Sequence, residues 1–196
     1  VTTWYDQSGK GNHASQATAA NQPVIQKATK GPGYMCVFSG SQYLTGMSYT
    51  VLNNTNYTLC TSTRRTSSAG TGGSAIDNPI LTSYGSALAT NQYLHLIHRN
   101  NTAFIHGQYA NDVSVTLPSF LTSTTEPIIY SFGLTSSTSG RNLFVYNDPS
   151  GTSNPVKTQA TGQTGLLSMT AGNISFGISS LSQGTYFLGE MYEILI

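Results

Sequence analysis

Residues 92–109 read QYLHLIHRNNTAFIHGQY, and this stretch has the form of a β-hairpin. Two apolar and aromatic runs flank Asn100-Asn101, and asparagine adopts the positive φ of a tight turn more readily than most residues. Because side chains alternate along a strand, the first strand is expected to carry Leu94, Leu96 and His98 on one face and Tyr93, His95, Ile97 and Arg99 on the other. The return strand carries Phe104 and His106 on one face and Ile105 and Tyr109 on the other. The leucine face predicts a buried core. The other face gathers tyrosine, histidine and arginine and is the better candidate for recognition.

The same pattern of short strands continues outward along the chain in both directions. Clusters of Gly, Pro, Ser, Asn and Thr recur roughly every ten residues, which predicts an all-β, antiparallel β-sandwich or barrel. No sustained 3.6-residue repeat occurs, so at most one or two helical turns are expected. Strands are expected at 36–38, 57–63, 80–81, 92–98, 103–109, 113–117, 127–134, 143–147, 174–178 and 189–196, with loops at 66–78, 135–142 and 148–165. Neither a repeat nor a change of composition divides residues 1–196, so a single domain is expected.

The composition is poor in charge and rich in small polar residues. Charged residues make up 8% of the chain, while 27 Thr, 25 Ser and 14 Asn make up about a third of it. Eight basic and seven acidic residues create no field that attracts nucleic acid, and no apolar run is long enough to enter a membrane. Twelve Tyr, seven Phe and one Trp imply a packed core rather than disorder. We therefore expect a neutral, hydroxylated partner and a protein that works outside the cytoplasm.

The cysteines and the start of the sequence allow two further expectations. Cys36 and Cys60 are the two cysteines, and both lie in strand-like runs where a small buried thiol is ordinary packing, so free thiols are the favoured interpretation. The chain begins at Val1 without a signal peptide, and we expect a domain cut from a longer polypeptide that carries the targeting signals elsewhere.

Residues 1–23 read VTTWYDQSGKGNHASQATAANQP and contain a polar turn. Asp6 and Ser8 can accept hydrogen bonds from nearby backbone N–H groups, and Gly9 and Gly11 adopt φ values that other residues resist. Trp4 is expected to anchor the turn to the core, because tryptophan usually buries its ring. The predicted structural residues of this turn are Trp4, Asp6, Ser8, Gly9, Gly11 and Asn12.

This motif, W-Y-D-Q-S-G-x-G-N-H followed by N-Q-P, resembles a segment of concanavalin A-like jelly rolls of the laminin-G type, which occur in phage, large-virus and bacterial surface or secreted proteins. It is also similar to a segment in the catalytic domain of family 54 α-L-arabinofuranosidases. Three further stretches resemble the jelly-roll family in the expected order, at residues 37–44 (VFSGSQYL), 93–107 and 189–196 (GEMYEILI). The resemblance implies a jelly-roll sandwich and an extracellular or virion-surface location. It implies less about the ligand, because this fold hosts lectins, hydrolases and adhesion modules.

The acidic residues argue against an enzyme. A retaining glycosidase needs two carboxyl groups about 5 Å apart. The available acids are Asp6, Asp77, Asp112, Glu126, Asp148, Glu190 and Glu193. Glu190 and Glu193 come closest to a pair, but three residues apart on a regular strand they are expected to face opposite sides. The Cys-Cys pair and the mid-chain Glu strand of the arabinofuranosidases have no counterpart, so the resemblance does not extend to their catalytic residues.

No cofactor is expected, and the metal-binding signals are sparse. His95 and His98 should point to opposite faces, which disfavours a site formed by three histidines with His106. Calcium stays open as a ligand, since some laminin-G-type domains bind it through loop carboxylates. Asp6, Asp77, Asp112 and Asp148 lie in expected turns or loops, but no dense acidic cluster identifies a set of ligands.

The leading hypothesis is a non-catalytic recognition domain for carbohydrate or a glycosylated receptor, acting as an attachment module of a larger surface or fibre protein. Sugars are recognised by aromatic faces and neutral hydrogen-bonding side chains. The candidate ligand-binding residues are Tyr84, Tyr93, His95, Arg99, His106 and Tyr109. The alternatives are a structural domain of a viral fibre or capsid that binds protein neighbours, with a homotrimer as one form, and a glycoside hydrolase.

Overall fold

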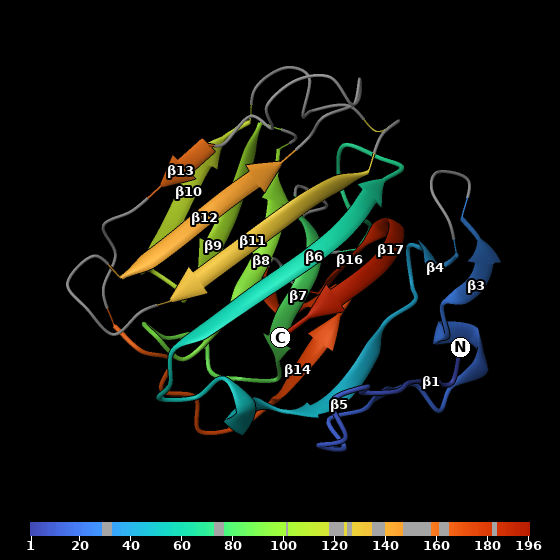
Figure 1. Cartoon of the computed structure of the whole chain (residues 1–196), viewed down its shortest axis with the longest axis horizontal. Helices are drawn as coiled ribbons and strands as arrows, with labels where there is room; N and C mark the ends of the chain where they lie inside the picture. The colour runs from blue at the N-terminus through green and yellow to red at the C-terminus, as the bar shows by residue number, and fades with distance from the viewer. Residues whose placement is uncertain are drawn as a thin grey trace.

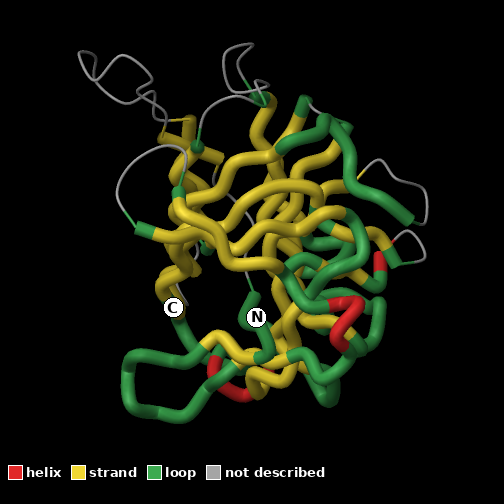
Figure 2. The backbone as a smooth tube through the Cα atoms, turned by 90° about the vertical axis from the view of Figure 1, so that its right-hand side faces the viewer, coloured by secondary structure: helices red, strands yellow, loops and turns green. Residues whose placement is uncertain are grey.

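The computed structural model describes residues 1–28, 33–72, 77–100, 102–117, 124, 127–134, 140–146, 158–160, 165–181 and 184–196. It confirms the expected all-β fold: two antiparallel sheets pack face to face as a sandwich (Figure 1). Within the described part, the helical segments are two short 3-10 turns, Ala19–Asn21 and Tyr49–Val51, drawn red in Figure 2. No described helix has the length and apolar character needed to cross a membrane.

Each sheet combines strands from distant parts of the sequence. The eight-stranded sheet contains, in spatial order, β1 (Thr3–Trp4), β2 (Ala14–Ser15), β5 (Leu44–Ser48), β14 (Asn173–Phe176), β7 (Asp77–Tyr84), β8 (His95–Arg99), β9 (Ala103–Gly107) and β10 (Asp112–Thr116). The seven-stranded sheet contains β13 (Thr158–Ala160), β12 (Arg141–Tyr146), β11 (Ile128–Leu134), β6 (Tyr57–Arg65), β17 (Leu188–Leu195), β4 (Tyr34–Ser39) and β3 (Val24–Lys27).

The predicted hairpin is confirmed as β8 and β9. Ile97 lies opposite Ile105, and Asn100 has the positive φ expected of the turn, while Asn101 lies outside the described residues. Leu94, Leu96 and Phe104 face inward and are at most 1% exposed. Burying each such side chain contributes about 1.5–3 kcal/mol to the stability of the fold.

Two histidines on the inner face bridge the sandwich. His98 Nε2 lies 2.8 Å from Tyr130 Oη, and His106 Nε2 lies 2.7 Å from Tyr57 Oη. Both histidines lie on the eight-stranded sheet, whereas Tyr130 and Tyr57 lie on the facing sheet. The buried imidazoles therefore gain partners across the core, which offsets the cost of removing them from water.

The outer face of the hairpin is not open to solvent. A covering arm, residues 178–181 and 184–187, includes the short strands β15 (Ile178–Ser179) and β16 (Thr185–Tyr186). Its strands pack on the neighbouring strand β7, and Leu181 reaches the outer face of the hairpin. Ser180 N donates to Tyr93 Oη at 2.7 Å. Under the arm lies a second small core of Tyr93, Ile97, Ile105 and Leu181, with Tyr109 at its edge.

A β-bulge in β17 corrects one expectation about the acidic residues. The register shifts between Met191 and Glu193, so that Glu190 lies opposite Arg64 and Glu193 lies opposite Ser62. Arg64 and Ser62 are two residues apart on β6 and share a face, and so do Glu190 and Glu193. The expectation that these two glutamates face opposite sides is therefore wrong, because the extra residue of the bulge changes the alternation.

The cysteines lie on two different strands, β4 and β6, with β17 between them. Cys36 lies opposite Met191 of β17, and Cys60 lies opposite Leu195. Both thiols are free, which confirms the interpretation from sequence.

Candidate functional site

The polar turn that follows β1 is organised by one carboxylate. Asp6 accepts hydrogen bonds from Ser8 N at 2.7 Å, Ser8 Oγ at 2.8 Å and Asn12 N at 3.0 Å. The bond from the Ser8 hydroxyl, followed by those from the two backbone N–H groups, lowers the pKa of Asp6 to about 2. Gly9 and Gly11 have φ values of 77° and 75°, a left-handed conformation that glycine adopts without a steric cost. The turn is a closed unit whose carboxylate stays ionised.

The aromatic residues before the turn lie in two different environments. Trp4 is half-buried and packs against the core, with its ring centroid 6.0 Å from that of Phe176. Tyr5 is 62% exposed, and its ring meets His13 edge to face at 5.1 Å. Trp4 therefore anchors the turn, while Tyr5 presents an aromatic surface to solvent.

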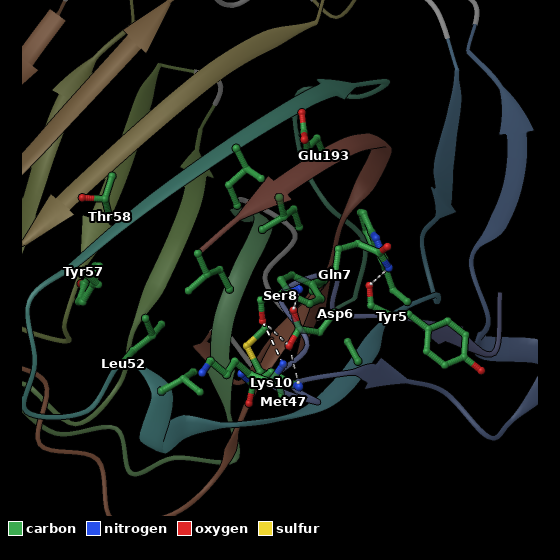
Figure 3. Close-up of a pocket in the computed structure, with 18 of the residues that line it drawn as sticks. Tyr5, Asp6, Gln7, Ser8, Lys10, Met47, Leu52, Tyr57, Thr58 and Glu193 are labelled. Carbon is green, nitrogen blue, oxygen red and sulfur yellow. Dashed lines mark hydrogen bonds between the residues drawn. The ribbon is translucent and has the colours of Figure 1, made fainter.

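A cleft of about 890 Å³ lies between this turn, β5, the start of β6 and the end of β17 (Figure 3). Its floor includes the apolar side chains of Met47, Leu52 and Phe176. Its neutral polar lining consists of Gln7, Ser8, Asn12, Asn56 and Thr58. A cleft with an apolar floor and a few polar groups around it is the usual form of a small-molecule site.

A second hollow of about 330 Å³ continues from the cleft toward β3 and β4. The two hollows share Trp4, Tyr5, Gln7 and Tyr192. The second is also lined by Ile25 and Tyr34, which are 60% and 69% exposed. We call the two hollows together the turn groove.

The turn groove holds few charges, and they are separated. Lys10 and Glu193 line it together with Asp6. Figure 3 shows the Glu193 carboxylate pointing away from the Asp6 turn, while the Tyr5 ring projects outward beside the turn. Asp6 is engaged by its own turn, so Lys10 and Glu193 are the charged groups left for a ligand among the described lining residues.

Glu190 does not line this groove and is held by two partners. Arg64 Nε donates to Glu190 Oε2 at 2.7 Å and Arg64 Nη2 donates to Oε1, while Tyr192 Oη donates to Oε2 at 2.7 Å. Burial alone would raise the pKa of Glu190, but the hydrogen bonds from Arg64 and Tyr192 outweigh burial and leave the pKa below its ordinary value. The Glu190 carboxylate is therefore occupied by its contacts with Arg64 and Tyr192.

Neither of the two comparisons made with known proteins gives a relative. No protein-family model matches the chain, and no curated protein matches it in sequence.

Three of the candidate ligand-binding residues are buried. Tyr93, His95 and His106 are at most 1% exposed. The covering arm lies over Tyr93, and His106 faces the core, where it meets Tyr57. These side chains support the sandwich, and a ligand on this surface does not reach them.

The other three candidates lie in separate places. Arg99 is half-buried in an ion pair with Asp77, with Nε 2.9 Å from Oδ1. Tyr109 is half-buried at the β9–β10 turn with a φ of 51°. Tyr84 is 37% exposed and lies beside Tyr43 and Tyr186, at 6.5 Å from the ring of Tyr43. The structure therefore does not bring the six predicted residues into one site.

The carboxylates considered for calcium are also dispersed. Asp77 is paired with Arg99, and Asp112 accepts from Gln108 N and meets His95 Nε2 at 3.3 Å. Asp148 lies outside the described residues, as does Glu126. Across the described ranges, no three His, Cys, Asp or Glu residues are grouped so that they could hold a metal ion.

The residues of the turn groove were not all expected from sequence. Tyr5, Gln7 and Lys10 lie inside the motif and could have been singled out as exposed neighbours of a rigid turn. Asn56 directly precedes β6, Thr58 lies on β6 and Tyr192 lies on β17, so all three are far from the turn in sequence. No local signal marks them, because the pairing of β17 with β6 and the packing of the two sheets are what bring them beside the turn.

Proposed function

We propose that this chain is a non-catalytic recognition domain that binds a neutral carbohydrate chain in the turn groove. The observation that carries the proposal is the pair of exposed tyrosines, Tyr5 and Tyr34, on a groove whose other polar groups are mostly neutral amides and hydroxyls. The C–H face of a pyranose ring packs on an aromatic ring, and sugar hydroxyls pair with amide groups that both donate and accept.

The groove also offers unused hydrogen-bonding groups on a rigid support. Within the described part of the chain, the side chains of Asn12, Asn56 and Thr58 make no hydrogen bond to another residue. The Asp6 network fixes the turn before any ligand arrives, which reduces the entropy lost on binding. A preformed groove with free amides fits recognition of a flexible, hydroxylated polymer.

The lowered pKa values of two carboxylates support a non-catalytic role. A glycosidase needs one carboxylic acid that stays protonated near neutral pH, which requires a raised pKa. Asp6 and Glu190 both have lowered pKa values, and Glu193 points away from the Asp6 turn (Figure 3). The proposal therefore assigns no hydrolytic step to these residues.

The two-sheet sandwich is compatible with a concanavalin A-like jelly roll, and we propose that the domain is of that kind. By the resemblance of its motifs to that family, the domain would be an attachment module of a larger surface or fibre protein, outside the cell or on a virion, with a glycan or glycosylated receptor as partner. Since this fold hosts several functions, the support for carbohydrate binding comes from the groove and not from the fold.

One observation favours a second candidate function, assembly with protein neighbours. Strand β3 lies at the edge of its sheet, all four of its residues are exposed, and Val24 and Ile25 are 53% and 60% exposed. An uncovered apolar edge strand can pair with another chain. A fibre or capsid domain, including a homotrimer, would use such an edge.

A glycan array tests the proposal, using the wild type, Tyr5→Ala, Tyr34→Ala and the control Ile129→Ala. Ile129 is 52% exposed on β11 and does not line the groove. We expect binding to a neutral glycan that each tyrosine variant weakens about tenfold and that the control leaves unchanged. Absence of binding to every glycan, together with a defined oligomer by light scattering, would overturn carbohydrate recognition in favour of assembly. Release of reducing sugar would show a hydrolase instead.

A further inference from the structure

Three tyrosines from distant parts of the chain meet on the outer side of the eight-stranded sheet. Tyr43 precedes β5, Tyr84 ends β7 and Tyr186 lies in β16. The ring centroid of Tyr43 is 6.5 Å from that of Tyr84 and 6.2 Å from that of Tyr186, with interplanar angles of 39° and 42°. We call these three residues the tyrosine triad.

The phenol groups of the triad lie near one another. The pKa of Tyr186 is raised first by burial and then by its proximity to the Tyr84 and Tyr43 hydroxyls. In the described part of the chain, none of the three hydroxyls has a hydrogen-bond partner. Tyrosine hydroxyls in a packed position usually find a partner, so this group of donors and acceptors is available to a ligand.

An amide lies beside the triad. Asn173 of β14 is exposed and sits directly opposite Tyr84 of β7 in the sheet register. Paired residues of neighbouring strands point to the same face, so the amide and the phenol ring share a surface. The turn groove has the same combination of an exposed aromatic ring and free amide groups.

The triad is separated from the turn groove by the sheet itself. Phe176 of β14 lines the groove and packs in the core, so its neighbour Ser175 faces the other way. Ser175 lies opposite Thr82, two residues before Tyr84, which places Tyr84 on that outer face. Substitutions in the triad and in the groove therefore act on different surfaces.

We propose that Tyr43, Tyr84, Tyr186 and Asn173 form a second saccharide subsite, which makes the domain bivalent toward a polysaccharide. This inference rests on the proposed carbohydrate recognition and extends it to a second surface. One sugar ring stacks on Tyr84, the most exposed member of the triad, and its hydroxyls meet the neighbouring phenols and the Asn173 amide. Two subsites on one rigid domain bind a multivalent glycan surface about a hundredfold more tightly than one subsite does.

The test uses bacterially produced protein, free of N-linked glycans, with isotope-labelled tyrosine rings. The probes are soluble malto-, cello-, xylo- and manno-oligosaccharides, and the corresponding insoluble or polymeric glycans. The variants are Tyr84→Ala, Tyr84→Phe, Tyr5→Ala, the pair Tyr5→Ala with Tyr84→Ala, and Ile129→Ala as the control. Tyr84→Phe keeps the ring and removes the hydroxyl. Thermal unfolding of each variant shows whether it is folded.

We expect a saccharide to shift the ring signals of Tyr43, Tyr84 and Tyr186 separately from that of Tyr5. Tyr84→Ala should abolish the saccharide-induced shifts of Tyr43 and Tyr186 and leave the shift of Tyr5. It should also weaken binding to the polymer about a hundredfold, and Tyr84→Phe should weaken that binding less than Tyr84→Ala does. Shifts confined to Tyr5 and its neighbours would overturn the second subsite and leave the turn groove in place. Shifts confined to the triad would overturn the groove and support the triad. No shift in either set would overturn both.

Discussion

His98 and Tyr130 join the two sheets through the interior of the sandwich, with Nε2 and Oη 2.8 Å apart. Burial, and then the nearby Arg65 guanidinium, lower the pKa of His98 well below its ordinary value. The folded state therefore holds His98 neutral, while the unfolded chain binds a proton near pH 6.5. Stability from this group is present above that pH and is lost as the pH falls toward the folded-state pKa.

The first prediction is a loss of stability in mild acid. Below about pH 6.5 the free energy of unfolding should fall by about 1.4 kcal/mol per pH unit from His98. Urea unfolding at pH 7, 6 and 5 measures the slope. His98→Gln keeps a hydrogen-bonding group for Tyr130 but does not titrate, so its slope should be flatter. Equal slopes for the variant and the wild type would contradict this account of His98.

The second prediction concerns Gly107, which lies between His95 and Asp112 on neighbouring strands. A Cβ on Gly107 would overlap the His95 ring and would come 2.6 Å from Asp112 Oδ1. Gly107→Ala should therefore displace His95 and lower the free energy of unfolding by about 2–4 kcal/mol. Denaturant unfolding checks this, with Ser114→Ala as an exposed control on β10. A loss no larger than that of the control would show that His95 can move without cost.

The third prediction separates the partners of Glu190. Glu190→Gln leaves the Arg64 guanidinium without its counter-charge and should destabilise the fold by about 1–3 kcal/mol. Tyr192→Phe removes one hydrogen bond and should cost about 1 kcal/mol. Because the folded pKa of Glu190 is lowered, this stability should be present above about pH 4.3 and fall in stronger acid. A double-mutant cycle with Arg64→Met measures the coupling, and a coupling near zero would contradict the assigned pairing.

The fourth prediction concerns the turn at Asp6. Asp6→Ala removes the acceptor for Ser8 N, Ser8 Oγ and Asn12 N, so the turn should lose its fixed shape while the core stays packed. We expect glycan binding to fall at least about tenfold with little change in the melting temperature. Because the pKa of Asp6 is about 2, the wild-type turn should keep its amide chemical shifts from neutral pH down to about pH 3. A variant that binds glycan normally would remove the turn from the proposed site.

Sequence reasoning succeeded where strands alternate over several residues. The inward positions of Leu94, Leu96 and His98 follow directly from the period of two, and the structure has them buried. Val24–Lys27 and Leu44–Ser48 were missed as strands. All four residues of the first are exposed on an edge, and Gly46 interrupts the second, so neither has the strong alternation that predicts a strand.

The candidate site was harder to predict, because it depends on contacts between distant segments. Tyr93 looked like a surface residue because Ile178–Ser179 and Thr185–Tyr186, which cover it, are too short to be recognised in the sequence. Glu190 and Glu193 seemed to diverge because a bulge has no reliable local signature. The tyrosines of the triad lie more than forty residues apart from one another, as their positions 43, 84 and 186 show, and only the sheet order joins them.

The covering arm makes the molecule three layers thick over the hairpin, and this has a consequence for local unfolding. Strand β8 has hydrogen-bonded neighbours on both sides, the main core beneath it and the second core above it. Its amides can exchange with solvent only when the arm lifts or when the whole sandwich opens. The backbone amides of Leu96 and Ile97 should therefore be among the slowest to exchange with deuterium, and a loosened arm should quicken their exchange before it lowers the global stability.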